Sequence, residues 1–135
     1  MFEFDFESLD VYQLAIKYYR DILKITKVLP RDMQFSLGDQ LRRAALSIAN
    51  NIAEGSGKES KKEKIYFFNT SLHSTRECIP MLTILQKEKV INNEIYNEFR
   101  KICRRISSML VKLIKSVREG SFKKAVTQKQ PNFTS

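Results

Sequence analysis

Four stretches of the sequence place apolar residues three and four positions apart, which is the spacing of one buried face of an α-helix. They cover about residues 9–29, 35–54, 61–87 and 93–118. The links between them are short, and short links join helices that run antiparallel. The pattern therefore predicts an all-α protein with a single domain, folded as an antiparallel up-down-up-down four-helix bundle.

Residues with known preferences for helix ends mark the boundaries of these stretches. Ser8 precedes the first helix as a candidate N-cap, and Pro30 ends it because the residue before a proline avoids the helical region. Gly55 is a candidate C-terminal stop for the second helix. Residues 60–63 (Ser-Lys-Lys-Glu) have the spacing of a capping box, and residues 92–93 (Asn-Asn) offer an N-cap to the fourth helix.

Length and composition exclude several other classes of protein. A chain of 135 residues buries a sizeable core, and 4 Gly with 3 Pro are too few for a turn-rich sandwich or barrel. No apolar run approaches the ~20 residues of a membrane span, and the acidic first residues are unlike a signal peptide. Cys78 and Cys103 form no CxxC pair, which favours free thiols in a reducing compartment over a disulfide. We expect a cytoplasmic protein without a membrane partner.

The charge is large and unevenly distributed. The net charge of the whole chain is +9, although residues 1–8 form an acidic arm. The positive charge is therefore concentrated in the bundle at 9–119 and the basic tail at 120–135. Segregated positive charge predicts a polyanionic partner, with nucleic acid before membrane. The alternative is a protein whose basic surface serves only solubility.

The fourth helix carries seven of the 24 basic residues, on the side opposite its apolar face. Seven bases form this basic stripe: Arg100, Lys101, Arg104, Arg105, Lys112, Lys115 and Arg118. A solvated helix face usually mixes charges of both signs, whereas a stripe of one sign repels itself and is relieved by phosphates. The stripe predicts contact with the backbone of RNA or DNA, and the alternative is a plain solvated face.

A second basic group lies around the link between the second and third helices. Its members are Lys58, Lys61, Lys62 and Lys64, interspersed with two glutamates. Amide groups at a helix N-terminus attract anions, so these lysines are a candidate phosphate site. The P-loop pattern GxxxxGK[ST] is absent, and a flexible charged turn is the alternative.

The second and third helices carry features of association. A polar line beside the apolar stripe of the second helix comprises Gln40, Arg43, Ser47, Asn51 and Glu54. Such a line is either ordinary surface or a hydrogen-bonded seam against another helix or subunit. On the third helix, Phe67, Met81, Ile84 and Leu85 widen the apolar arc beyond one face, which predicts self-association.

Nothing in the sequence indicates catalysis. His73 is the only histidine, the cysteines lack the spacing of metal ligands, and no Glu-x-x-His motif is present. Ser74 and Glu77, three residues apart on a helix, indicate a local hydrogen bond rather than a nucleophile and its base. We expect no enzymatic activity, no metal and no cofactor.

Residues 40–55, QLRRAALSIANNIAEG, resemble the central motif of a known family. The chain is similar to the four-helix bundle proteins named after 23S rRNA intervening sequences, also called the S23 ribosomal protein family. Residues 9–15 match the opening segment of the family, Ser74 and Glu77 match a Ser-x-x-Glu motif on the third helix, and the similarity spans about residues 6–119. Ala49 stands where many members have proline.

The resemblance implies a ring-like homopentamer in which the polar line, Ser74 and Glu77 hold helices or subunits together. It also implies similarity to the accessory variability protein of diversity-generating retroelements, a basic pentamer that binds nucleic acid and a reverse transcriptase. We therefore expect a non-enzymatic homo-oligomer that binds the phosphate backbone of RNA or DNA. The alternative is a scaffold that docks a partner protein without nucleic acid; a small-ligand bundle has little support, because convergent polar groups are lacking.

Overall fold

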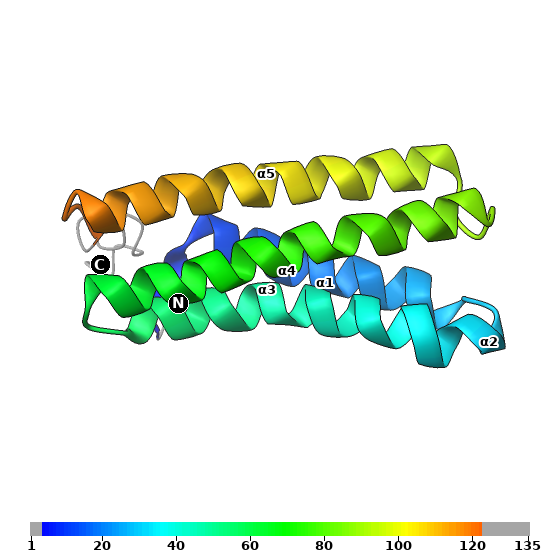
Figure 1. The fold of residues 1–135 in the computed structure, drawn as a ribbon, viewed down its shortest axis with the longest axis horizontal. Helices are drawn as coiled ribbons and strands as arrows, with labels where there is room; N and C mark the ends of the chain where they lie inside the picture. The colour runs from blue at the N-terminus through cyan, green and yellow to red at the C-terminus, as the bar shows by residue number, and fades with distance from the viewer. Residues whose placement is uncertain (1–3, 123–135) are drawn as a thin grey trace, which may run out of the picture.

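The computed structural model describes residues 4–122, which form an all-helical bundle (Figure 1). The four long helices are α1 (Asp10–Lys27), α3 (Asp39–Gly57), α4 (Lys61–Lys87) and α5 (Asn93–Arg118). A 3-10 turn, η1 (Asp5–Ser8), precedes α1, and α2 (Arg31–Met33) with the π-helical turn η2 (Gln34–Gly38) joins α1 to α3. No strand occurs in the described residues, so the predicted fold class is confirmed.

The helices run up, down, up and down along one long axis (Figure 1). α3 packs against α1 and α4, and α5 packs against α4 and α1. All four long helices contribute side chains to one core, whose largest fully buried members are Tyr18, Ile22, Leu41, Ile48, Ile52, Phe68, Leu82, Leu85, Ile106 and Leu110. Burying each large apolar side chain contributes about 1.5–3 kcal/mol, so the 3.6-residue pattern of the sequence specifies the fold. Within residues 4–122, no helix combines the length and the apolar character needed to cross a bilayer.

Two helix starts follow the sequence prediction, and one does not. The Ser60 hydroxyl accepts a hydrogen bond from the Glu63 amide at 3.1 Å, and the Asn92 side chain accepts one from the Ile95 amide at 2.8 Å. Ser8, however, is not the N-cap of α1: Leu9 occupies that position, without a capping side chain. The Ser8 hydroxyl instead donates to the Asp5 carbonyl at 2.8 Å, because residues 5–8 turn in a 3-10 helix of their own.

The second helix is longer at both ends than the sequence indicated. Helical structure resumes directly after Pro30 and continues through α2 and η2 into α3. At the other end, Gly55 was expected to stop α3, but the helix continues to Gly57. The first helix ends before Pro30, as expected, and Pro30 is the N-cap of α2, where its missing amide removes no helical hydrogen bond. At Gly55 the surrounding packing overrides the average preference of glycine for a helix end.

Gly55 has a packing role instead of a terminating one. A Cβ atom at this position would lie 2.8 and 2.9 Å from two ring carbons of Phe68 and 3.1 Å from the Cβ of Phe67. The residue is buried, and the ring occupies the space that any side chain would need. Gly55 therefore allows the C-terminal end of α3 to lie close to the first turns of α4.

We predict that Gly55→Ala destabilises the bundle whereas Gly57→Ala does not. The extra methyl at position 55 forces Phe68 to move, and overpacking of this kind costs about 1–3 kcal/mol. Gly57 has no atom within 4 Å of the corresponding position, so alanine there should stabilise the helix by a few tenths to about 1 kcal/mol. Urea unfolding of both variants measures the difference, and equal free energies of unfolding would contradict the packing role of Gly55.

Both cysteines are free and lie in the core beside Tyr18. Cys78 on α4 and Cys103 on α5 are buried, and the Cys103 thiol donates to the Tyr18 hydroxyl at 3.3 Å. Burial raises the pKa of Cys78 to about 12 and that of Cys103 to about 11, from an ordinary value of 9.0. The thiols are therefore held protonated and unreactive in the folded protein.

The raised pKa values predict a loss of stability at alkaline pH. Unfolded thiols lose their protons above about pH 9 while the folded ones keep them, so the free energy of unfolding falls between pH 9 and 11. The slope is about 1.4 kcal/mol per pH unit for each thiol. Cys103→Ala should remove one thiol's share, which denaturant unfolding at pH 8, 9 and 10 can measure; an unchanged slope would show that this thiol is not responsible.

Candidate nucleic-acid interface

The seven bases of the basic stripe lie on one element, α5, and all seven are exposed. The opposite side of this helix is buried in the core, through Phe99, Cys103, Ile106, Leu110, Leu113, Ile114 and Val117. The helix therefore has an apolar side that the bundle covers and a mainly cationic side that faces solvent, on which Val111 is an exposed apolar exception.

Few of these charges are neutralised within the chain. In the part of the chain that the structure describes, Lys115 is the only stripe residue with an ion pair, at 3.9 Å from Glu119. Both partners are largely exposed, so this pair is screened by solvent and contributes little. Six bases of the stripe thus have no acidic partner among residues 4–122. An external anion would relieve their mutual repulsion.

Arg100 is held in place by an aromatic neighbour. Its guanidinium donates to the Tyr96 hydroxyl at 2.9 Å and lies 6.0 Å from the centre of the ring. The same hydroxyl shares a hydrogen bond of 2.9 Å with Thr83 on α4. The hydrogen bond with Thr83, and to a smaller extent the bond and charge of Arg100, lower the pKa of Tyr96.

The lysines around the α3–α4 link do not form one cluster. Lys58 pairs with Glu54 at 3.6 Å and lies 5.3 Å from the centre of the Phe67 ring. The Lys61 ammonium reaches across to the carbonyl of Arg118 at 3.5 Å, so Lys61 belongs with the end of α5. Lys62 is exposed on α4.

Lys64 has a structural role. Its ammonium donates to the carbonyl of Ser56 at 3.0 Å and to that of Lys58, and it is nearly buried. These carbonyls lie at the C-terminal end of α3, where a cation satisfies both the hydrogen-bonding groups and the helix dipole. The ammonium also lies 4.8 Å from the centre of the Phe122 ring, which is buried against α4. The basic tail expected at 120–135 lies outside the described residues from 123 onward.

The centre of the polar line joins α3 to α4 within one chain. The hydroxyls of Ser47 and Ser74 share a hydrogen bond of 2.8 Å, and the Asn51 amide donates to the carbonyl and hydroxyl of Ser47 at 2.8 and 2.9 Å. Ser74 therefore bonds to Ser47 on the neighbouring helix. The prediction of a local hydrogen bond between Ser74 and Glu77 is wrong, and the Glu77 side chain is exposed.

The outer members of the polar line border a surface groove of about 470 Å³ between α3 and α4. Gln40 and Arg43 contribute from α3, and Glu77, Pro80 and Met81 from α4. Within residues 4–122, Arg43 and Glu77 make no ion pair, although their opposite charges border one groove. Glu54, further along the line, is paired with Lys58.

We predict that Asn51→Ala lowers the free energy of unfolding without weakening any nucleic-acid binding. The variant loses two hydrogen bonds to Ser47, worth about 0.5–1.5 kcal/mol each, and it changes no charge. The neighbouring Asn50 is exposed, so Asn50→Ala is the matched control and should leave stability within about 0.5 kcal/mol. Thermal unfolding compares the two, and equal stabilities would contradict a structural role for Asn51.

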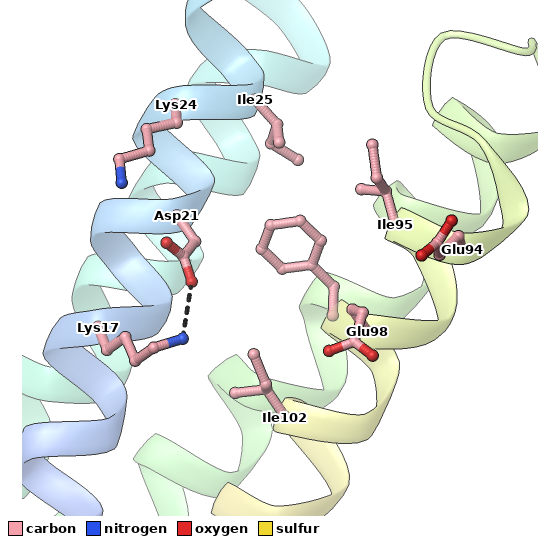
Figure 2. A pocket seen from close by; sticks show the side chains of 9 residues that line it. Lys17, Asp21, Lys24, Ile25, Glu94, Ile95, Glu98 and Ile102 are labelled. Carbon is pink, nitrogen blue, oxygen red and sulfur yellow. Dashed lines mark hydrogen bonds and ion pairs between the residues drawn. The ribbon is translucent and has the colours of Figure 1, made fainter.

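A second groove, of about 350 Å³, lies between α1 and α5 (Figure 2). Its floor is apolar, from Ile25, Ile95, Phe99 and Ile102. Charged residues form its rim, with Lys17 and Lys24 on α1 and Glu94 and Glu98 on α5. Lys17 also pairs with Asp21 at 3.2 Å. The sequence pattern does not reveal this groove, because its two walls come from helices far apart in the chain.

The described residues offer no arrangement for metal chemistry. Within residues 4–122, no three His, Cys, Asp or Glu side chains come together as metal ligands. His73 is exposed on α4, and Ser74 is bonded to another serine rather than to a base.

The fold and the one-sided charge define a small, basic four-helix bundle protein. The sequence profile described as 23S rRNA-intervening sequence protein matches residues 7–112, and the chain belongs to this family. A crystal structure of a protein of unknown function from the S23 ribosomal protein family of Bacteroides thetaiotaomicron VPI-5482 has the same fold. It is 24% identical, with a TM-score of 0.73 over 78% of this chain and 95% of that one. No curated protein matches the chain significantly.

Proposed function

We propose that this protein is a non-enzymatic, homo-oligomeric nucleic-acid-binding protein that contacts the phosphate backbone through α5. The observation that carries the proposal is the basic stripe: seven exposed bases on one helix, six of them without an acidic partner among the described residues. Phosphates supply the missing negative charge, and each neutralised base releases a counterion, which drives binding. Such contacts carry no information about base identity, so the binding is independent of sequence.

The proposal includes self-assembly, with five subunits as the family resemblance implies. Arg43 and Glu77 border one groove without pairing in the described part of the chain, so they are available to a neighbouring subunit. Leu46 and Ile84, on the helices that form this groove, are 39% and 43% exposed. A ring of several copies presents the stripe repeatedly along one strand, which raises the overall affinity without new contacts.

The second candidate function is a scaffold that docks a partner protein, such as a reverse transcriptase by family resemblance. The observation in its favour is the α1–α5 groove, whose apolar floor and charged rim suit an amphipathic helix. In either case we propose a cytoplasmic location, in keeping with two free, buried thiols.

We predict that the affinity for nucleic acid falls steeply with salt and that the double variant Arg100→Gln/Arg104→Gln flattens this dependence. Each lost phosphate contact lowers the slope of log affinity against log salt by about 0.7–0.9, so the pair should lower it by about 1.6. Glutamine is a good helix former, which preserves α5. Fluorescence titrations of labelled RNA, single-stranded DNA and duplex DNA at several salt concentrations measure the slope.

The matched control is Arg20→Gln/Lys27→Gln, which removes two exposed charges from α1 and should leave the slope nearly unchanged. Light scattering on the same wild-type sample should give a mass near five times the 15.8 kDa of one chain. A wild-type protein that binds none of the three nucleic acids at low salt would refute the binding proposal and favour the scaffold. A mass of one chain at micromolar concentration would refute the assembly.

A further inference from the structure

Three contacts fix how α4 and α5 are aligned. Gln86 donates to Asn93, and Thr83 bonds to Tyr96. Moving three residues back along α4, from Gln86 to Thr83, therefore moves the contact three residues forward along α5, from Asn93 to Tyr96. This is the register of two antiparallel helices. The same register holds at the far end, where Lys61 contacts Arg118.

This register brings further bases of α4 beside the basic stripe of α5. Arg76 precedes Thr83 by seven residues, about two turns of helix, and Lys62 precedes it by 21 residues, about six turns. At about 100° per residue, Arg76 lies about 20° and Lys62 about 60° around α4 from Thr83. Both are exposed, Arg76 close to the line of Thr83 that faces α5 and Lys62 further toward solvent on the same side. The alignment places Arg76 opposite Cys103, so that its charge lies beside the turn from Arg100 to Arg104.

The acidic residues of both helices point away from this edge. On α4, Glu63, Glu77 and the adjoining Glu88 lie about 100–140° around the helix from Arg76, and Glu77 borders the groove shared with α3. On α5, Glu94 and Glu98 border the groove shared with α1, about 120–160° from Arg100. The surface along the α4–α5 seam therefore carries bases and, within the described residues of these two helices, no acid.

We propose that the phosphate backbone of a nucleic acid lies along the α4–α5 seam and that Arg76 and Lys62 of α4 bind it together with Arg100, Arg104 and Arg118 of α5. This inference rests on the proposed function and specifies its surface. The distance from Arg76 to Lys62 along α4 is about 21 Å, which matches about six phosphates of one B-form strand.

The seam assigns unequal roles to the bases of the stripe. Lys101, Arg105 and Lys112 lie about 100–140° around α5 from Arg100, toward α1 and the glutamates of its groove. A strand that follows the seam does not reach them. Arg76, which is absent from the stripe, should therefore matter more for binding than Arg105, which belongs to it.

The test compares Arg76→Gln with Arg105→Gln, since both remove one exposed arginine from the middle of a long helix. We expect Arg76→Gln to weaken binding of a 20-nucleotide RNA, and of duplex DNA, about tenfold at moderate salt and to lower the salt slope by about 0.8. Arg105→Gln should weaken binding less than twofold. A second pair, Lys62→Gln against Lys112→Gln, should repeat the contrast near the far end of the seam, and thermal unfolding confirms that each variant is folded.

The outcomes separate this inference from the proposed function. If wild type binds but each α4 variant equals its α5 control, the seam is wrong and binding through α5 stands. If wild type binds no nucleic acid at low salt, the proposed function fails, and the seam with it. If wild type binds vesicles of anionic phospholipid but no nucleic acid, the surface recognises a membrane and both proposals are overturned.

Discussion

The close approach of α3 and α4 at Gly55 is the contact on which the rest of the bundle depends. The Phe68 ring fills the space that a side chain at position 55 would occupy, and Lys64, one turn before Phe68, caps the end of α3. The bond between Ser47 and Ser74 continues the same interface two turns further along. With α3 and α4 fixed to each other, α1 and α5 close the core by packing against this pair and against one another.

Much of this arrangement follows from the sequence, because helix period and capping chemistry are local. The four helices, the Ser60 and Asn92 caps and the apolar side of α5 all depend on residues within a few turns of one another. Gly55 was misassigned for the opposite reason, because the ring of Phe68, on another helix, decides its role. Ser8 was misassigned although its determinant is local: residues 5–8 form a 3-10 turn, an alternative to the cap that average preference does not reveal.

The candidate site likewise has features that the sequence predicts and features that only the structure reveals. The sequence shows that the bases of α5 share one side of a helix, since that requires only the 3.6-residue period. It does not show which helix lies next to that side, and so it gave no role to Arg76. The hydrogen bond between Thr83 and Tyr96 sets the register of α4 and α5 and supplies that information. The hydrogen bond from Lys64 to the end of α3 likewise shows that Lys64 is an internal cap, unlike Lys61 and Lys62.

The grooves and the seam of this bundle differ in chemistry, and that difference makes the proposed assembly compatible with the proposed binding of a polyanion. The α3–α4 groove carries Arg43 and Glu77, whose opposite signs suit a second copy of the same surface. The α1–α5 groove combines an apolar floor with mixed charges. The α4–α5 seam carries bases and, among the described residues of these two helices, no acid. A subunit contact centred on α3 would leave α5 and the adjacent edge of α4 exposed. Assembly would then align the cationic seams of several subunits instead of covering them, which is the condition for one strand to bind them together.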